Sequence, residues 1–285
     1  MRILKDAKEF HELCLEWRAQ GRRLALVPTM GAYHAGHISL MRAAKAEGAG
    51  VLVSLFVNPA QFGPGEDLAA YPRDPERDAE IAENAGAEAL FMPAPHNLYK
   101  ADHAVWVEAP DLARKLCGVS RPEHFRGVCT VVLKLLLLSQ AHLAFFGEKD
   151  WQQLTIIRRM VRDLNVPAEI RGCPTVRETD GLALSSRNAY LTPEERAQAP
   201  QIRAGLQQAR ELVRRGERAA GVLCAAVRKH WARHLPLGRE EYLSLVHPHS
   251  LEEVDSIGAA ALMACAVRLG KARLIDNILL PQEEL

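Results

Sequence analysis

Short apolar runs alternate with longer helical patterns over the first 175 residues, and this alternation limits the fold more than any other feature. The runs that we predict to be strands are residues 24–27, 51–57, 89–92, 143–146 and 167–172. A strand that is covered on both faces reads as a continuous apolar run, as these do. Strands that alternate with helices at a spacing of about 30 residues are typical of βαβ units. The sequence therefore predicts an α/β fold, with a parallel sheet and helices on both faces.

The helices expected between these strands follow amphipathic or apolar patterns. On the first of them, Phe10, Leu13, Cys14 and Trp17 share one stripe. Residues 105–107 are expected to form a short edge strand. The predicted helices are residues 6–18, 38–45, a helix that follows residues 71–75 and runs through 85, and residues 111–117, 128–139 and 151–164.

The composition changes after residues 173–179, where we place a domain boundary. Residues 193–215 and 220–234 are long, charged, alanine-rich helical patterns. Strands are expected at 241–246, 261–268 and 273–277, and Gly270 separates the last two. The prediction is one domain over residues 1–175 and a smaller α+β domain over residues 176–285.

The turn at residues 34–37, His-Ala-Gly-His, lies where the first apolar strand gives way to a helix. Pro28 is expected to end that strand because it cannot donate to the ladder, and Ile38, Met41 and Ala44 should face inward. A helix N-terminus offers unpaired N–H groups and positive potential, which suit a phosphate. His34 and His37 can donate to phosphate oxygens, and Gly36 allows a ligand to approach. The alternative interpretation is two surface histidines beside a glycine.

Composition and charge exclude several other classes of protein. A net charge of +1 over 285 residues gives no footprint for nucleic acid or an anionic membrane. The apolar run at residues 131–138 is far shorter than the ~18 residues of a membrane span, and residues 1–6 do not resemble a signal peptide. The six cysteines have no Cys-x-x-Cys pairing, which favours reduced thiols in a cytoplasmic protein. The chain also lacks a P-loop and a Gly-x-Gly-x-x-Gly motif after a strand.

Five separated motifs, in order, carry a resemblance to a known family. The chain resembles the pantoate–β-alanine ligases, within the nucleotidylyltransferase superfamily that has a His-x-Gly-His signature. The resemblance implies a Rossmann-like domain for ATP and pantoate over residues 1–175 and a small lid domain over residues 176–285. It also implies a cytoplasmic homodimer that joins pantoate to β-alanine with ATP and Mg²⁺ through a pantoyl-adenylate. The motifs are residues 27–37, 56–62, 124–127, 146–154 and 180–188, with a further match at 273–277.

The resemblance also assigns residues to the site. His34, His37, Lys149, Ser185, Ser186 and Arg187 would be catalytic, since cations and fixed donors must meet the charge of the phosphoryl group. No protein metal ligand is expected, because Mg²⁺ would be held mainly by the ATP phosphates. Pantoate and β-alanine would contact Met30, Asn58, Phe62, Gln61 and Gln153. ATP would contact Pro28, Met30, His34, Gly36, His37, Gly147, Lys149, Asp150, Val176, Ser185, Ser186 and Arg187.

Several of these residues have simpler interpretations. Lys149 and Asp150 also fit a charge pair at a helix start, Gln153 fits an ordinary helix residue, and residues 185–188 fit a helix cap. His230 and His234, four residues apart on a predicted helix, fit a metal pair or, more simply, a solvated face.

The chain also departs from the family pattern. Tyr33 stands where leucine is common, at what we expect to be the outer wall of the ATP site, and the stretches 99–103, 141–142 and 246–249 are atypical. The rival functions are another nucleotidylyltransferase of the same superfamily and a non-catalytic nucleotide-binding regulatory domain.

Overall fold

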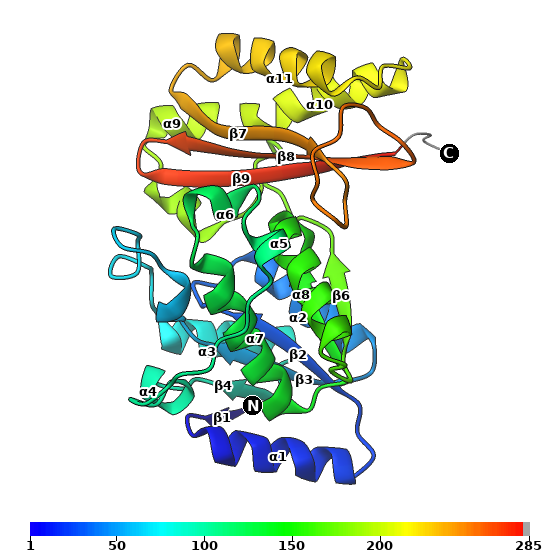
Figure 1. Cartoon of the computed structure of the whole chain (residues 1–285). Helices are drawn as coiled ribbons and strands as arrows, with labels where there is room; N and C mark the ends of the chain where they lie inside the picture. The colour runs from blue at the N-terminus through cyan, green and yellow to red at the C-terminus, as the bar shows by residue number, and fades with distance from the viewer. Residues whose placement is uncertain (282–285) are drawn as a thin grey trace. The chain divides into compact units, whose positions relative to one another are not determined.

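The computed structural model of the protein describes residues 1–281 and contains two compact units (Figure 1). The first unit comprises residues 1–113, 121–148 and 153–174. The second comprises residues 114–120, residues 149–152 and the chain from Thr175 onward. Two short pieces from within the first 175 residues, 114–120 and 149–152, therefore pack with the C-terminal part.

The first unit is built on a six-stranded sheet in which every pair is parallel, in the order β1-β4-β3-β2-β5-β6. This confirms the predicted α/β class. The strand order reverses between β2 and β5, and open sheets bind ligands at the carboxyl ends of the strands beside such a point. The strands are β1 (Arg2–Leu4), β2 (Leu24–Thr29), β3 (Gly50–Leu55), β4 (Ala89–Phe91), β5 (Leu143–Gly147) and β6 (Glu169–Cys173).

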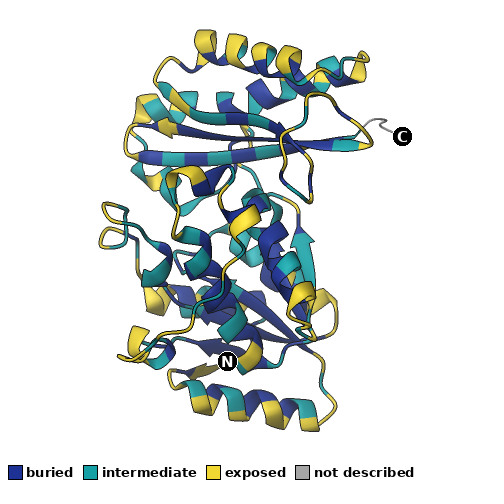
Figure 2. Cartoon of the chain, in the orientation of Figure 1, coloured by how far each residue is buried: buried dark blue, intermediate teal, exposed yellow. Residues whose placement is uncertain are grey.

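Helices cover both faces of this sheet, and its central strands are buried (Figure 2). Ala25 and Val27 of β2 pack in one core cluster with residues of α2 and α3. Their neighbours in β2 point to the opposite face, which α1 helps to cover: Phe10 of α1 stacks on Phe91 of β4 with 4.4 Å between ring centroids. The helices are α1 (Ala7–Ala19), α2 (Ala35–Ala46), η1 (Pro59–Gln61), α3 (Pro75–Ala85), α4 (Pro95–Leu98), α5 (Pro110–Ala113), α7 (His124–Ser139) and α8 (Trp151–Asp163), whose first two residues belong to the second unit.

Pro28 does not end the first central strand, contrary to the prediction, because β2 continues to Thr29. The Leu24 carbonyl accepts from His142 on the β5 side, and the Thr29 carbonyl accepts from Phe56 on the β3 side. Residues alternate along a strand, so the nitrogen of Pro28 faces β5, and the pairing with β5 ends at Leu26. The proline therefore leaves the pairing with β3 intact, and that pairing continues through Thr29 and Leu55.

Two other expectations for the first 120 residues differ from the structure, and one strand was not expected. Residues 105–107 form no strand, and the Val107 N–H donates instead to Oγ1 of Thr130 at 3.0 Å. The helix predicted at 111–117 is two short helices, α5 and α6 (Cys117–Ser120), because Leu116 adopts a φ of 43°. The edge strand β1 was not predicted, since three residues are too few to show a periodicity.

The second unit contains a three-stranded antiparallel sheet with helices, as expected of an α+β domain. The strands are β7 (Gly238–Val246), β8 (Ala260–Leu269) and β9 (Ala272–Pro281), in that spatial order, and Gly270 turns between the last two with a φ of 53°. The helix predicted at 193–215 is divided at Pro200, which has no N–H to offer a helix interior. The resulting helices are α9 (Pro193–Gln198) and α10 (Gln201–Arg214), followed by α11 (Ala220–His234).

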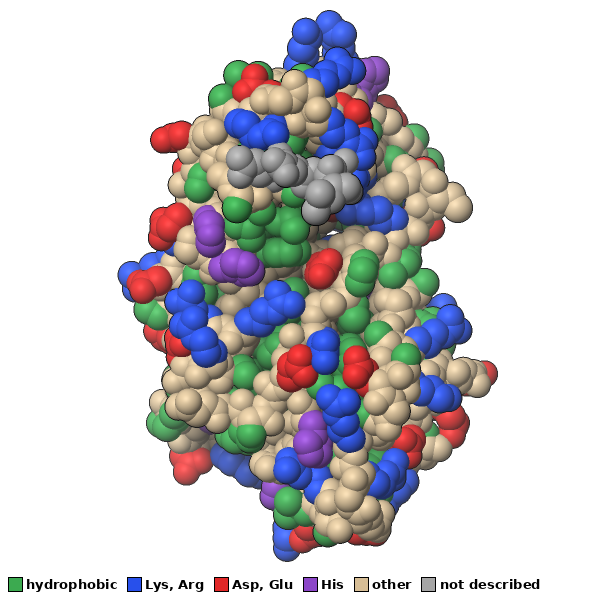
Figure 3. Space-filling view, turned by 90° about the vertical axis from the view of Figure 1, so that its right-hand side faces the viewer, with side chains coloured by type: hydrophobic (Ala, Val, Ile, Leu, Met, Phe, Trp, Pro, Cys, Tyr) green, Lys and Arg blue, Asp and Glu red, His purple; other side chains and the backbone are tan. Residues whose placement is uncertain are grey.

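Two further observations concern the described residues as a whole. None of their helices has the length and apolar character needed to cross a membrane. Basic and acidic side chains are interspersed on the face shown in Figure 3, in keeping with the net charge of +1.

Candidate functional site

A sharp turn connects β2 to α2, and a buried carboxylate holds it. Gly31 has a φ of 88° and Ala32 a φ of 52°, so both lie in the left-handed region. The two carboxylate oxygens of Asp78, on α3, accept from the backbone N–H groups of Ala32 and Tyr33, each at 2.8 Å. A Cβ on residue 31 would lie 2.7 Å from Asp78 Oδ2, so this turn requires glycine.

Asp78 was not among the residues selected from the sequence. Its side chain is only 2% exposed. Asp78, Ala82 and Ala85 lie at i, i+4 and i+7, so the acid occupies the buried stripe of α3. A carboxylate in the apolar stripe of a helix is the signal that would have identified it.

His34 and His37 cap helix α2, which begins one turn earlier than predicted. Nδ1 of His34 accepts from the Gly36 N–H at 3.1 Å, and Nδ1 of His37 accepts from the His34 N–H at 3.4 Å. A backbone N–H can only donate, so each Nδ1 carries its lone pair and the proton of each neutral ring resides on Nε2. The ring centroids are 4.2 Å apart. The arrangement places two Nε2–H donors at the positive end of a helix, an environment that suits an anion.

Gly36 is needed for this cap as well as for the approach of a ligand. A Cβ at position 36 would lie 2.9 Å from both Cε1 and Nδ1 of His34, which folds over it. Tyr33 lies in the core: its side chain is buried, its hydroxyl is 2.9 Å from Thr29 Oγ1, and burial together with the nearby Asp78 raises its pKa. The tyrosine packs against His37, with 5.4 Å between ring centroids.

Three of the residues expected to bind pantoate form a connected group around η1. Asn58 is buried; its Nδ2 donates to Gln61 Oε1 and to the Gly127 carbonyl, each at 3.1 Å, and its Oδ1 accepts from Ala60. Gln61 Nε2 in turn donates to Met30 Sδ at 2.9 Å. The structure thus brings together Met30, Asn58 and Gln61 from the ends of β2 and β3.

Residues 121–127, which lead into α7 and form its first turn, contact this group. Nδ1 of His124 and the guanidinium of Arg121 contact the Gln61 carbonyl at 2.9 and 3.2 Å. Arg121 also forms a two-pronged ion pair with Glu66, at 2.8 and 2.6 Å. Burial alone would raise the pKa of Glu66, but the bonded guanidinium outweighs it and holds the pKa below its ordinary value.

Phe62 follows η1 and contacts the buried Tyr71 edge to face, with 6.0 Å between ring centroids. Gly147 is the last residue of β5, beside the point where the strand order reverses. Gln153 is the third residue of α8 and is partly buried.

Lys149 and Asp150 lie in the short helix η2 (Glu148–Asp150), in a segment that packs with the second unit. Lys149 Nζ is 3.4 Å from Asp150 Oδ2. The indole of Trp151 donates to the Pro248 carbonyl at 2.9 Å. Gln152 accepts from the Cys117 N–H and donates to the Lys115 carbonyl, so its amide holds the backbone of residues 115–117. The next residue, Gln153, belongs to the first unit.

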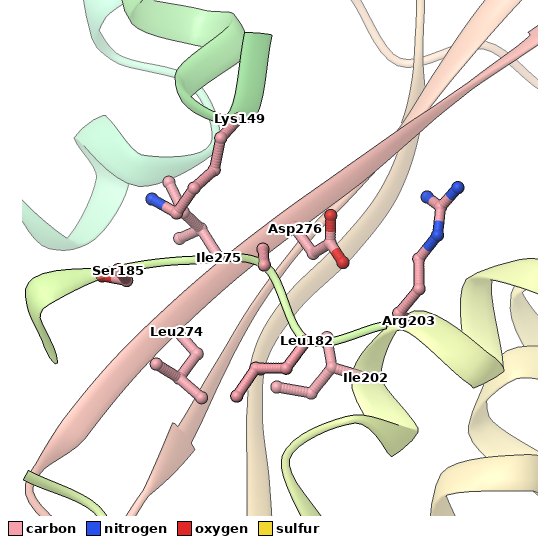
Figure 4. Close-up of a pocket in the computed structure, with 9 residues that line it drawn as sticks. Lys149, Leu182, Ser185, Ile202, Arg203, Leu274, Ile275 and Asp276 are labelled. Atoms are coloured by element: carbon pink, nitrogen blue, oxygen red, sulfur yellow. The ribbon is translucent and has the colours of Figure 1, made fainter. Parts of the chain in front are cut away.

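A pocket of about 280 Å³ of empty space, part of it open to solvent, lies in the second unit (Figure 4). Lys149, Ser185, Arg203 and Asp276 line it together with apolar side chains such as Leu182. Lys149 and Ser185, far apart in the sequence, therefore face one pocket.

Ser185 caps the short helix η3 (Ser186–Tyr190), as the simpler interpretation of residues 185–188 expected. Its Oγ accepts from the Arg187 N–H at 3.3 Å. Its hydroxyl hydrogen is a donor in addition. The carbonyl of Val176 accepts from the Leu184 N–H at 3.0 Å, which holds this segment against the chain that leads to Ser185.

The candidate residues thus occur in both units. The first unit holds Pro28, Met30, His34, Gly36, His37, Asn58, Gln61, Phe62, Gly147 and Gln153; the second holds Lys149, Asp150, Val176, Ser185, Ser186 and Arg187. His230 and His234 lie elsewhere in the second unit, and His230 Nε2 is 2.9 Å from Gln201 Oε1. Residues 1–281 contain no group of three or more His, Cys, Asp or Glu side chains placed to hold a metal ion.

Comparison with known proteins adds to this geometry. The family model described as pantoate-beta-alanine ligase matches residues 2–279. The pantothenate synthetase of Desulfovibrio desulfuricans is 63% identical over 98% of this chain and 99% of its own length. That of Nitratidesulfovibrio vulgaris is 60% identical over 99% of this chain and 100% of its own length.

Two solved structures are similar over nearly the whole chain. Pantothenate synthetase from Thermus thermophilus superimposes with a TM-score of 0.92 and 43% identity, covering 98% of this chain and 99% of that one. Pantoate-beta-alanine ligase from Francisella tularensis, complexed with a β,γ-ATP compound and β-alanine, gives a TM-score of 0.80 and 34% identity, covering 98% and 97%. The signature turn, the fold and these matches agree, and the chain belongs to the pantoate–β-alanine ligase family.

Proposed function

We propose that the chain condenses pantoate with β-alanine at the expense of ATP, giving pantothenate, AMP and pyrophosphate through an enzyme-bound pantoyl-adenylate. The observation that carries this proposal is the family match over residues 2–279. The cap of α2 supports it, because two Nε2–H donors at a helix N-terminus suit a nucleotide phosphate. Another nucleotidylyltransferase would share that cap but has no need of the Met30, Asn58 and Gln61 group.

In the first step an oxygen of the pantoate carboxylate attacks the α-phosphorus of ATP. The new bond forms as the bond to the bridging oxygen of pyrophosphate breaks, and negative charge grows on the phosphoryl oxygens and on the leaving group. His34 and His37 donate to these oxygens, and Lys149 and Arg187 supply positive charge. Ser185 and Ser186 add neutral donors, and the catalysis consists of charge stabilisation and positioning.

ATP and pantoate are held by the remaining residues in this proposal. Gln61 and Gln153 hold the hydroxyls of pantoate, since an amide both donates and accepts. Asn58 keeps the amide of Gln61 in place, and Met30 and Phe62 face the dimethyl carbon. Pro28, Gly36, Gly147, Asp150 and Val176 contact ATP, with Asp150 accepting from a ribose hydroxyl.

In the second step the amine of β-alanine attacks the acyl carbon of the adenylate, the bond to AMP breaks, and the amine loses a proton. The adenylate must be shielded from water until the amine arrives. We assign this shielding to the domain of residues 176–285, acting as a lid on the domain of residues 1–175. The amine attacks in its neutral form, so the rate should rise with pH toward the amine's own pKa.

Mg²⁺ fits the site as a companion of the nucleotide. The ion keeps several waters and takes oxygen ligands, often from substrate phosphates with one or two carboxylates. In this proposal the ATP phosphates and water would supply its ligands. When bound, the ion neutralises phosphate charge; the residues named above orient the phosphates.

We further propose a cytoplasmic homodimer. All six cysteines are free, buried thiols, which suits a reducing compartment. Sedimentation equilibrium at micromolar concentration tests the dimer: a mass close to twice 31.6 kDa is expected, and a mass of one chain would contradict it.

The adenylate is tested by isotope exchange between pyrophosphate and ATP. Exchange should require pantoate and Mg²⁺ and should proceed without β-alanine. Exchange that appeared only in the presence of β-alanine would rule out a free-standing first step. In the same assay, His37→Ala and Lys149→Ala should each lower kcat by about 10²–10³; losses below tenfold would remove these residues from the proposal.

A further inference from the structure

Two consecutive residues of β9, Asp276 and Asn277, contact two segments that are far apart in the sequence. Asn277 Nδ2 donates to the carbonyl of Lys149 at 2.9 Å. The carboxylate of Asp276 accepts from both terminal nitrogens of Arg177, each at 2.8 Å. Neighbouring residues of a strand point to opposite faces, so the pair reaches to both sides of one strand.

The bond from Asn277 acts on the backbone of the residue that carries the proposed phosphate-binding ammonium. Lys149 lies in η2, a 3₁₀ helix of three residues that makes few hydrogen bonds of its own. The donor from Asn277 therefore fixes the backbone position from which the Lys149 side chain extends. The Arg203 guanidinium donates to the Asn277 carbonyl at 3.1 Å and so fixes the strand at this residue.

The ion pair of Asp276 acts on the segment that leads to Ser185. Nη1 of Arg177 also donates to the Gly181 carbonyl at 3.1 Å, and residues 177 and 183 form an isolated bridge. Arg177 thus closes the loop that ends two residues before Ser185. Asp276 is 4% exposed, and breaking a buried pair of this kind leaves an uncompensated charge.

The two anchors are also joined to each other. The Asn277 N–H donates to Oδ1 of Asp276 at 2.7 Å, which fixes the carboxylate relative to the backbone that carries the amide. Lys149, Ser185 and Asp276 all line the pocket of the second unit, and Figure 4 shows them around it. β9 is therefore the common support of both phosphate-binding segments of this unit.

We propose that Asp276 and Asn277 are positioning residues for the reaction, which hold Lys149 and the Ser185 segment at a fixed separation. This inference rests on the proposed function, in which both segments meet the phosphates of ATP. Displacement of a binding group by about 1 Å can cost on the order of 10²-fold in rate. Loss of the Asn277 donor should therefore lower the rate of adenylate formation without removing any group that touches substrate.

The test uses Asn277→Asp and Asn277→Ala in the full chain, with pantoate-dependent exchange of pyrophosphate into ATP as the assay. The aspartate variant keeps the size of the side chain, loses the donor and adds a negative charge, whereas the alanine variant loses the donor without adding a charge. Each variant should lower kcat by about 10- to 100-fold. Asn97→Ala is the matched control, because Asn97 Nδ2 donates to the Lys5 carbonyl at 3.0 Å in the other unit; its kcat should remain within twofold of wild type.

A double-mutant cycle distinguishes positioning from a general loss of structure. If Asn277 acts through Lys149, then Asn277→Ala should cost less than twofold in a chain that already carries Lys149→Ala. An equal cost in both backgrounds, or an Asn277→Asp variant within twofold of wild type, would overturn the inference. Absence of exchange in the wild-type chain would instead overturn the proposed function, which keeps the two failures distinct.

Discussion

Gly127 is the residue at which a single methyl group should do the most damage to the proposed pantoate group. It lies in α7, and a Cβ added there would be 2.2 Å from the carbonyl oxygen of Ala60 and 2.6 Å from the nitrogen of Gln61. Both atoms belong to backbone, which cannot rotate away as a side chain can. Gly127→Ala should therefore displace η1 from α7.

The size of the effect follows from these contacts. An ordinary contact of a Cβ is 3.4 Å or longer, so the two segments must separate by about 1 Å. Overpacking of this kind costs about 1–3 kcal/mol, and the better helix propensity of alanine returns up to ~1 kcal/mol. The bond from Asn58 to the Gly127 carbonyl would be lengthened as well. We expect a net loss of about 1–2 kcal/mol in the free energy of unfolding.

The functional effect should fall on pantoate. A shift of Gln61 by about 1 Å should lower kcat/KM for pantoate by up to ~10²-fold, while KM for ATP changes little. Urea unfolding and initial rates with each substrate varied in turn measure both effects. Gly221→Ala is the matched control, because Gly221 also lies in a helix, α11, and a Cβ added there would have nothing within 4 Å. If Gly127→Ala proved as stable and as active as Gly221→Ala, the close packing of η1 on α7 would not matter to the site.

Three further predictions concern a buried acid, an ion pair and the metal. Asp78→Asn turns one acceptor toward a backbone N–H into a donor, so the free energy of unfolding should fall by about 1–3 kcal/mol and kcat should fall with it; urea unfolding that matched wild type would contradict this. The pKa of Glu66 is held below its ordinary value of 4.5. The ionised carboxylate therefore stabilises the fold above that pH, and this stabilisation is lost as the pH falls through the folded-state pKa. Arg121→Met should remove this contribution of Glu66 to the pH dependence of the free energy of unfolding between about pH 5 and 3. Chelation of Mg²⁺ should abolish exchange, and Mg²⁺ without ATP should leave Tm unchanged, because the ion arrives with the nucleotide; a rise in Tm with the metal alone would point to a separate protein site.

The local patterns were sufficient for five of the six strands of the parallel sheet and for its main helices. Apolar runs such as that of β3 identified buried parallel strands, and the stripe of Phe10, Leu13, Cys14 and Trp17 identified the face of α1 that is buried. The turn at residues 34–37 could also be identified from a local pattern, since an apolar strand, a glycine and the start of a helix follow one another within a few residues. The roles proposed for Lys149 and the serines came from the resemblance and stay predictions.

The sequence by itself determined the α/β class, the position of the turn between β2 and α2 and the second α+β unit, because each depends on periodicities within a single segment. Only the tertiary structure decided what holds those segments. The carboxylate of Asp78 reaches a turn 46 residues away, and Asn277 reaches Lys149 across 128 residues. Residues 149–152 pack with the second unit, most of which begins at Thr175. Such contacts depend on how distant segments meet in space, and a pattern within one segment contains no record of its partner.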